Sequence, residues 1–235
     1  MRENVVSVPA LYQGITGIAH GGYVAGLMAR QSPEPVKVTL RSAPPLDTPL
    51  TLEGRSLFNG RGRTIMEAEP VGEITERLGV PGMEDVAGRT PHPRFDDHPY
   101  PQCFVCGTER EDGFGLRVSA SDSDGTAAGI VTPGGPLLGP GDEVSSEFVW
   151  AIVDCVTVWA FADRWDDEGW WPAVTGQIAV RQLQELRRDR PYVAAARTAG
   201  RQGRRIVVNA QVNDADGDPC AVGRAVWVVV PAAPA

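Results

Sequence analysis

A single carboxylate stands inside a long apolar run of this sequence. Between Phe148 and Ala162 the only strongly polar residues are Asp154 and Thr157. A helix that is apolar on every side must be surrounded by protein or lipid, and this run is too short to span a bilayer. A carboxylate in its third turn must therefore be hydrogen-bonded, paired or catalytic, because burying it bare is costly. Asp154 is either an anchor for a neighbouring strand or an acid–base group.

The helix that carries this carboxylate is predicted over residues 145–165. Ser145 or Ser146 can cap its start, and Glu147 suits the positive end of the helix dipole. A second helix is predicted over residues 20–31, where His20-Gly21-Gly22 begins a segment that stops before Pro33. Its small residues recur on one side, so another backbone can approach it closely. His20 either caps this helix or packs beside it.

Composition indicates an ordinary globular protein. The 235 residues are 42% hydrophobic and 22% charged, enough for a core, and the formal net charge is −8. This acidic balance argues against a general nucleic-acid or anionic-membrane surface. The start of the chain does not resemble a signal peptide, and no segment is long enough to span a membrane. Four cysteines fit a reducing, cytoplasmic location better than a disulfide framework.

The spacing Cys103-x-x-Cys106 leaves several interpretations open. Upstream, His92 and His98 could complete a metal site, although structural zinc sites usually show two tight ligand pairs. A cytosolic pair of this spacing can also be redox-active.

The remaining elements alternate strands and turns around each predicted helix. Strand-like runs are separated by Gly, Pro, Asn and Asp turns, and the segment 76–102 has no periodicity and is predicted to be a linker. The expected strands are residues 5–13, 36–43, 50–58, 63–74, 115–120, 126–132, 173–186, 192–198, 204–213 and 220–230. Each half therefore has strands, one helix and an antiparallel meander.

A short internal match supports a duplicated unit. Gly62-Arg63-Thr64-Ile65 aligns with Gly203-Arg204-Arg205-Ile206, each at the hairpin that enters the last long strand of its half. We therefore predict an α+β fold with two units, 1–75 and 103–235, each a curved antiparallel sheet wrapped around one helix.

Three strings resemble the hotdog-fold thioesterases of the PaaI-like branch. They are His20-Gly21-Gly22, the lead-in Cys103-Phe104-Val105-Cys106-Gly107 followed by Gly113-Phe114-Gly115-Leu116, and the helix Phe148–Ala160 with its acid. The resemblance covers most of the chain outside 76–102 and implies a double hotdog. It also explains the cysteine pair as the lead-in to a strand. On that basis we expect no metal and no cofactor, with coenzyme A only as part of a substrate.

In the family the acid falls nine residues after the HGG histidine, on the same helix. Here Ala29 stands nine residues after His20, and Ser145 stands nine residues before Asp154. The first helix keeps the glycines and the second keeps the acid. Because hotdog sites lie between two units, the resemblance implies one composite site per chain. The equivalent position on the other side of the two units would be inactive.

The resemblance also implies roles for these residues. The Gly21 N–H would stabilise the oxyanion of thioester hydrolysis, and Gly22 would support the turn. Asp154 would be a general base on water or a direct nucleophile. Thr175 takes the position of a family Ser or Thr that orients the water, unless it is an ordinary strand threonine. The family's asparagine before HGG is replaced by Gly14.

Substrate contacts are expected from His20 and from arginines at hairpin turns. Arg63, Arg204 and Arg205 could meet the phosphates of coenzyme A or simply be solvated. Five tryptophans could line an acyl pocket or pack in the core and a lid, namely Trp150, Trp159, Trp165, Trp170 and Trp171.

Three functions remain. The leading one is hydrolysis of an acyl-CoA or acyl-carrier thioester, a small-molecule substrate. The second is a hydratase or dehydratase, although the Asp-x-Asn-Pro-x-His signature of that group is absent. The third is a non-catalytic hotdog that binds an acyl thioester or has a structural role. Two such chains could pair again as a homodimer.

Overall fold

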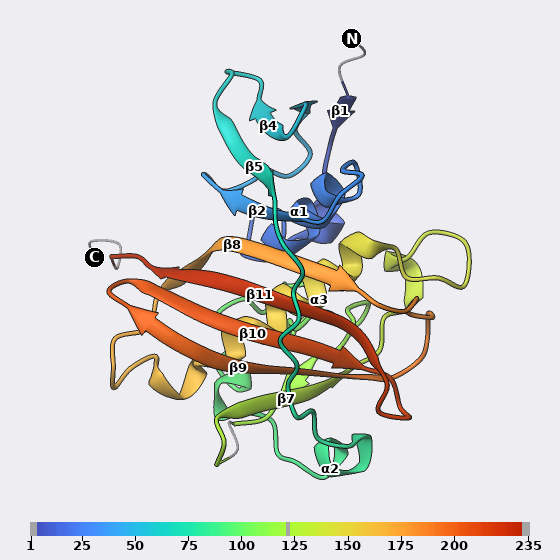
Figure 1. The fold of residues 1–235 in the computed structure, drawn as a ribbon, viewed down its shortest axis with the longest axis vertical. Coiled ribbons are helices and arrows are strands. Elements are labelled where there is room, and N and C mark those ends of the chain that lie inside the picture. Colours follow the sequence, from blue (N-terminus) through green and yellow to red (C-terminus); the bar gives the residue numbers. More distant parts are fainter. Residues whose placement is uncertain (1–3, 121–122, 232–235) are drawn as a thin grey trace.

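A computed structural model describes residues 4–120 and 123–231 of the chain. Residues 1–3 of the predicted first unit, and residues 121–122 and 232–235 of the second, lie outside the described ranges. The described chain forms one 11-stranded antiparallel sheet in the order β1-β3-β4-β5-β2-β8-β11-β10-β9-β7-β6. Two longer helices, α1 and α3, pack inside it (Figure 1). The predicted α+β class is confirmed.

The two halves of the chain repeat one topology. The first half consists of β1 (Asn4–Val6), α1 (Gly21–Ala29), β2 (Val36–Leu40), β3 (Leu50–Glu53), β4 (Ser56–Asn59) and β5 (Thr64–Pro70). The second consists of β6 (Arg117–Val118), β7 (Thr126–Val131), α3 (Ser146–Trp159), β8 (Ala173–Gln182), β9 (Tyr192–Gln202), β10 (Arg205–Asn213) and β11 (Pro219–Val229). In both halves the strand after the helix lies at the centre of the sheet, beside the last strand of its half.

The halves join edge to edge in the middle of the sheet. There β2 pairs antiparallel with β8, with Val38 opposite Ile178. Both residues are buried, at 0% and 1% exposure. The sheet therefore runs through the junction without an interruption, and no free strand edge remains at this point for another chain to pair with. The unit boundaries at residues 75 and 103 stay a prediction.

The helix α3 is buried on all sides, as its composition requires. Every residue from Glu147 to Trp159 is buried. The antiparallel strands β8 to β11 wrap one side of it, and α1 covers another (Figure 1). Ser145 occupies the N-cap position, but its side chain makes no capping hydrogen bond. Tertiary packing, more than capping, stabilises this helix.

The helices α1 and α3 cross at the small residues of α1. A β-carbon at Gly22 would lie 2.7 Å from the carbonyl oxygen of Trp150, and one at Gly26 would lie 2.5 Å from the Cα of Glu147. Later residues of α1 therefore contact earlier residues of α3, so the helices run antiparallel. Glycine at both positions permits this close approach.

Residues 50–58 form two strands, not the single strand predicted. Gly54, with φ of +58°, turns the chain between β3 and β4. The sequence Glu53-Gly54-Arg55 offers only one turn-forming residue, and its strand-like neighbours mask it. A glycine that adopts positive φ without strain is sufficient for such a tight hairpin.

The predicted linker is a structured covering of the second half. Its first part crosses the face of the sheet opposite α3 and leads to the short helix α2 (Met83–Ala87), whereas Phe95 near its end stacks on Trp159 of α3 (Figure 1). The Leu78 N–H donates to Gln211 of β10 at 3.1 Å, and Val86 packs against apolar residues of β7 and β9. These contacts are tertiary, so the segment shows no local periodicity in the sequence.

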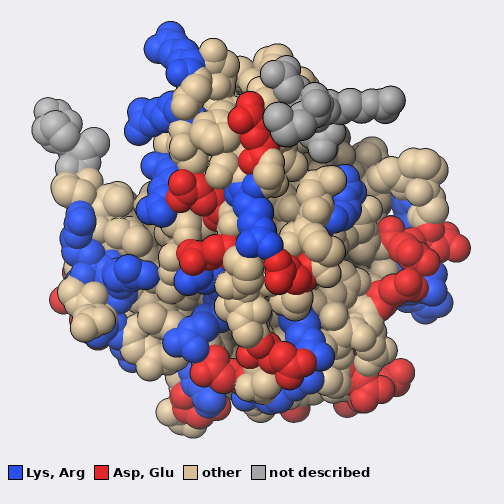
Figure 2. All heavy atoms as spheres, turned by 45° about the horizontal axis from the view of Figure 1, so that its top comes forward, with Lys and Arg blue, Asp and Glu red and all other residues tan. Residues whose placement is uncertain are grey.

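No helix among the described residues is long and apolar enough to cross a bilayer. On the face shown in Figure 2, acidic and basic side chains are interspersed. Several acidic and basic side chains of the described residues form exposed pairs, including Arg41 with Glu67.

Candidate active site

The carboxylate of Asp154 projects from the third turn of α3 onto the start of α1. Its Oδ2 atom accepts a hydrogen bond from the Gly22 N–H at 2.9 Å. Its Oδ1 atom accepts a hydrogen bond from the Thr175 hydroxyl on β8 at 2.8 Å. Asp154 is 4% exposed, so both partners replace water that the buried carboxylate has lost. The structure thus brings together three of the predicted site residues from three different elements.

Gly22 is required where the two helices touch. A β-carbon at this position would lie 2.4 Å from the Cβ of Asp154, closer than packed atoms allow. A larger residue would therefore push α3 away and break the hydrogen bond between the Gly22 N–H and the carboxylate. The predicted role of Gly22 as a support for the turn extends here to a direct contact with the acid.

Gly21, the residue before Gly22, also lies next to the Asp154 carboxylate. A β-carbon placed on it would lie 3.5 Å from Asp154 Oδ2 and 3.9 Å from Thr175 Oγ1. As the first residue of α1, Gly21 has no intrahelical acceptor for its N–H. No other acceptor for this N–H is found among the described residues. A backbone donor at the positive end of a helix dipole therefore remains available beside the acid.

His20 is the N-cap residue of α1 and is only 4% exposed. Its Nδ1 atom accepts from the Tyr23 N–H at 3.4 Å and lies 3.6 Å from Asp154 Oδ2. Its Nε2 atom lies 3.2 Å from the Cys155 sulfur. Burial lowers the pKa of His20, but the Cys103 thiol and the Asp154 carboxylate outweigh it, and the pKa is raised. Both ring nitrogens face protein atoms, as a capping and packing role requires.

Burial also governs the pKa of Asp154. Loss of water raises it, while His20, the Thr175 hydroxyl and the Gly22 N–H oppose the shift without cancelling it. A carboxyl group with a raised pKa is a stronger base once it is ionised, because basicity follows pKa.

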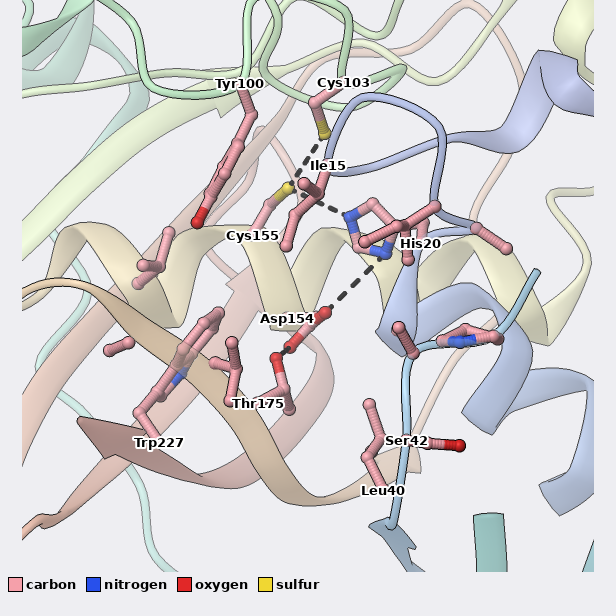
Figure 3. Close-up of a pocket in the computed structure, with 18 of the residues that line it drawn as sticks. Ile15, His20, Leu40, Ser42, Tyr100, Cys103, Asp154, Cys155, Thr175 and Trp227 are labelled. Atoms are coloured by element: carbon pink, nitrogen blue, oxygen red, sulfur yellow. Dashed lines mark hydrogen bonds and ion pairs between the residues drawn. The ribbon is translucent and has the colours of Figure 1, made fainter. Parts of the chain in front are cut away.

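The Asp154 carboxylate opens onto a cavity of about 260 Å³ between the two halves. Its walls are mostly apolar, including Ile15, Leu40, Val158 and Trp227, and Figure 3 shows Asp154, His20 and Thr175 at one side of it. Small-molecule sites are typically apolar clefts with a few polar groups that orient the ligand. This arrangement can hold an apolar group next to the acid and the Gly21 N–H.

The predicted coenzyme A arginines lie elsewhere. Arg63, Arg204 and Arg205 are exposed at hairpin turns and are not among the residues that line the cavity. The arginine in the cavity wall is Arg41, just after β2, which also pairs with Glu67 at 2.7 Å. Contact of the three hairpin arginines with a phosphate stays a prediction.

The tryptophans are divided between the core and the cavity. Trp159 stacks on Phe95, and Trp165 stacks on Trp171. The tryptophan that lines the cavity is Trp227 of β11, which the sequence analysis did not select. Its ring is held by a hydrogen bond of 3.0 Å from its Nε1 atom to the Thr157 hydroxyl.

The cysteine pair has different neighbours from those considered in the sequence. His92 pairs with Asp163 at 2.8 Å, and the Nδ1 atom of His98 accepts from the Tyr100 N–H at 2.9 Å. Cys103 and Cys106 instead meet Cys155 of α3, next to His20. Cys155 directly follows Asp154 in the sequence, but nothing local connects it with a pair about 50 residues upstream.

Comparison with solved structures identifies the architecture. The chain is similar to a conserved protein of unknown function with hot dog fold from Alicyclobacillus acidocaldarius, with TM-score 0.62 and 18% identity over 97% of this chain and 93% of that chain. It is also similar to the tesB protein of Mycobacterium avium subspecies paratuberculosis, with TM-score 0.64 and 16% identity over 97% and 92%. A third is the acyl-CoA thioesterase II TesB2 of Mycobacterium marinum, with TM-score 0.60 and 14% identity over 94% and 92%.

No protein-family model matches the sequence, and no curated protein sequence matches it. The likeness to solved structures covers nearly the whole of each chain and includes both halves of this one. Together with the repeated topology around α1 and α3, it shows that this chain has the hotdog fold, present twice in tandem.

Proposed function

We propose that this protein hydrolyses an acyl thioester at one composite site between its two halves. The observation that carries the proposal is the position of the Asp154 carboxylate. It is held by the Gly22 N–H and the Thr175 hydroxyl, at the wall of an apolar cavity and beside Gly21 at the start of α1. One helix supplies the donors and the other supplies the acid.

The chemistry follows from these positions. The acyl chain occupies the apolar cavity, and the thioester carbonyl oxygen accepts from the Gly21 N–H. That donor then stabilises the negative charge that develops on the oxygen as the carbonyl carbon is attacked. Asp154 takes the proton of the attacking water, or attacks directly to form an anhydride that water hydrolyses. Either route releases a carboxylic acid and a free thiol.

Two features favour coenzyme A or an acyl carrier as the thiol part. The structural neighbours with known names include an acyl-CoA thioesterase II. In addition, Arg41 stands at the cavity wall with an exposed guanidinium, which suits a phosphate.

The geometry argues against a hydratase that uses His20 as its base. Its two ring nitrogens face the Tyr23 N–H and the Cys155 sulfur, so neither is directed at a substrate. A general base must come within hydrogen-bond reach of the proton it removes.

A panel of acyl-CoA thioesters tests the proposal, with three measurements made on the same protein. We expect a time-dependent release of free thiol from at least one acyl-CoA, detected with a thiol reagent. Hydration of enoyl-CoA, detected by loss of its conjugated absorbance, without thiol release would contradict the proposal. Saturable binding of acyl-CoA by calorimetry, with no thiol release from any member of the panel, would also overturn it.

A further inference from the structure

A tight turn in the loop before β6 presents two thiols to α3. In this turn the Gly107 N–H donates to the carbonyl oxygen of Cys103 at 2.8 Å. A β-carbon at Gly107 would lie 2.5 Å from that oxygen and 2.3 Å from the carbonyl oxygen of Pro101, so the turn requires glycine. The close turn places Cys103 and Cys106 on the same side of the loop, where both approach Cys155.

Three buried ligand atoms converge at this point, and the sulfur of Cys106 lies beside one of them. The Cys155 sulfur lies 3.6 Å from the Cys103 sulfur and 3.5 Å from the Cys106 sulfur. The His20 Nε2 atom lies 3.2 Å from the Cys155 sulfur. Figure 3 marks this contact with a dashed line. The ligand atoms of His20, Cys103 and Cys155 all lie within 4.8 Å of one another. All four residues are at most 4% exposed, except Cys155 at 6%.

We propose that Cys103, Cys106, Cys155 and His20 bind one Zn²⁺ ion. With Zn–S bonds of about 2.3 Å and a Zn–N bond of about 2.0 Å, a tetrahedral site has S–S edges of about 3.8 Å and N–S edges of about 3.5 Å. The three edges at Cys155 are each shorter than these by roughly 0.2–0.3 Å. Cys106 is outside the group of ligand atoms within 4.8 Å of one another, so its side chain would have to rotate toward the others to complete the tetrahedron. Three sulfurs with one imidazole nitrogen is also a ligand set typical of structural zinc.

Packing of neutral thiols alone explains the cluster less well. Buried cysteines can pack as small hydrophobic residues, and a thiol is a weak hydrogen-bond donor. Here, however, one polar imidazole nitrogen lies within 4.8 Å of the sulfurs of Cys103 and Cys155, and the Cys106 sulfur lies 3.5 Å from that of Cys155, so that three separate segments contribute. These are the start of α1, the loop before β6, and α3. A metal ion among these atoms would use all four and tie the segments together.

The groups around the cluster suit a bound cation. With Nε2 on the metal, a neutral His20 would carry its proton on Nδ1, which would stop accepting from the Tyr23 N–H and turn its proton toward Asp154 Oδ2, 3.6 Å away. Metal-bound histidines usually direct this second nitrogen at a carboxylate or carbonyl. Zn²⁺ displaces one proton from each of the three thiols, which leaves the site with one net negative charge. The Arg117 guanidinium, which donates to the carbonyl oxygens of Cys106 and Gly107 at 3.0 and 3.2 Å, offsets that charge.

Four protein ligands leave no open position on the metal, so its role is structural. Through His20, the ion would hold the start of α1 against α3 and the loop before β6. It would therefore stabilise the arrangement that places the Gly22 N–H on Asp154. This inference departs from the expectation of no metal, and it does not depend on the protein being a thioesterase.

Metal analysis of the purified protein tests the site. We expect about one zinc ion per chain by inductively coupled plasma mass spectrometry after purification without chelators. Cys155→Ser, and Cys103→Ser with Cys106→Ser, should retain less than about a tenth of that zinc. Cys220→Ser is the matched control, because Cys220 is also buried but lies on β11, with its sulfur 3.6 Å from the Asp218 carbonyl oxygen. This variant should retain the full zinc content of the wild type.

A second measurement uses the wild-type protein and so does not depend on whether the cysteine variants fold. Wild-type protein stripped with a chelator and titrated with Co²⁺ should show thiolate-to-cobalt charge transfer and the intense visible bands of a tetrahedral site. Cys220→Ser should show the same spectrum. Four free thiols in a wild-type protein that binds neither Zn²⁺ nor Co²⁺ would overturn the proposal. A disulfide among the cluster cysteines in freshly purified protein, or full zinc content in Cys155→Ser, would overturn it as well.

Discussion

The start of α1 and the start of α3 occupy equivalent places in the two halves, yet their chemistry is opposite. The α1 start is His20-Gly21-Gly22, with backbone donors beside Asp154 and no acid on its own helix. The α3 start is Ser145-Ser146-Glu147, with side chains where α1 has glycines, and its helix carries Asp154. Each half lacks the component that the other keeps.

The two ends of the helix crossing show the consequence. At one end the Asp154 carboxylate meets the Gly22 N–H at 2.9 Å, beside the cavity. At the other end the Glu147 carboxylate is drawn to Arg30 at 2.9 Å, and Gly26 packs against the Glu147 backbone. Because both units lie in one chain, the two ends can differ, with the proposed site at one end and a packing contact at the other. A dimer of identical units would have to change both sites together.

The largest expected effect comes from the acids at the two ends. Asp154→Asn keeps the shape and an acceptor for Gly22, but it removes the base. We expect kcat for thioester hydrolysis to fall by about 10²–10⁴-fold. Glu147→Gln, the matched change at the other end, should leave kcat within about twofold. Steady-state thiol release measures both, and an equal loss in the two variants would mean that the ends are not functionally different.

Glycine substitutions separate packing from chemistry. A β-carbon at Gly22 or Gly26 would lie 2.4 or 2.5 Å from atoms of α3, so each change to alanine should lower the free energy of unfolding by about 1–3 kcal/mol. Gly22→Ala also displaces Asp154, and we expect its kcat to fall by about 10²-fold at a temperature where both variants are folded. Gly26→Ala should remain active. Urea unfolding and thiol release are the measurements, and comparable losses of activity would contradict a special role for Gly22.

The hydroxyl of Thr175 should have an intermediate effect. Thr175→Val removes the donor to Asp154 Oδ1 while keeping the strand and the side-chain shape. A hydrogen bond to a charged group contributes about 1.5–3 kcal/mol, so kcat should fall by roughly 10-fold or more. Thr175→Ser restores a hydroxyl and should recover most of the rate. If serine and valine gave the same rate, the hydroxyl would have no part in orienting the acid.

The smallest effect is expected at the arginines. Arg41 of the first half lines the cavity, whereas Arg204 of the second half does not. Because Arg41 is exposed and already paired with Glu67, its loss should raise KM for an acyl-CoA by only about threefold. The KM for the same acyl group on N-acetylcysteamine, a thiol that lacks the phosphates of coenzyme A, should not change in this variant. A larger effect in Arg204→Ala than in Arg41→Ala would favour the hairpin arginines as the phosphate contacts.

The elements with strong local patterns were predicted well. The helix around Asp154 was predicted from its nearly continuous apolar run, and its residues from Glu147 to Trp159 are all buried. The meander strands were also clear, because turn residues separate them. The turn at Gly54 was missed because one glycine is a weak signal between two strand-like runs. The path of residues 76–102 was missed because its contacts, such as Leu78 with Gln211, join positions 133 residues apart.

Some residues of the candidate site were predicted from the sequence, and others were not. Asp154, Gly21, Gly22 and Thr175 were selected through a family resemblance, and they meet at one place in the structure. The grouping of three cysteines with His20 was not predicted, since His20 and Cys155 are 135 positions apart. Proximity in the sequence had suggested His92 and His98 as partners instead. Only the crossing of α1 over α3 decides which imidazole reaches the thiols.

By itself, the sequence determined that one carboxylate would be buried in an apolar helix and that buried polar groups would have to satisfy it. It also determined that the chain would contain two copies of one unit, with glycines and acid on different copies. The tertiary structure decided which backbone N–H meets that carboxylate, where the cavity opens and which four side chains converge beside it. The physical reason is that burial and repetition are local properties of the chain, whereas these contacts depend on how closely two helices can approach at glycine.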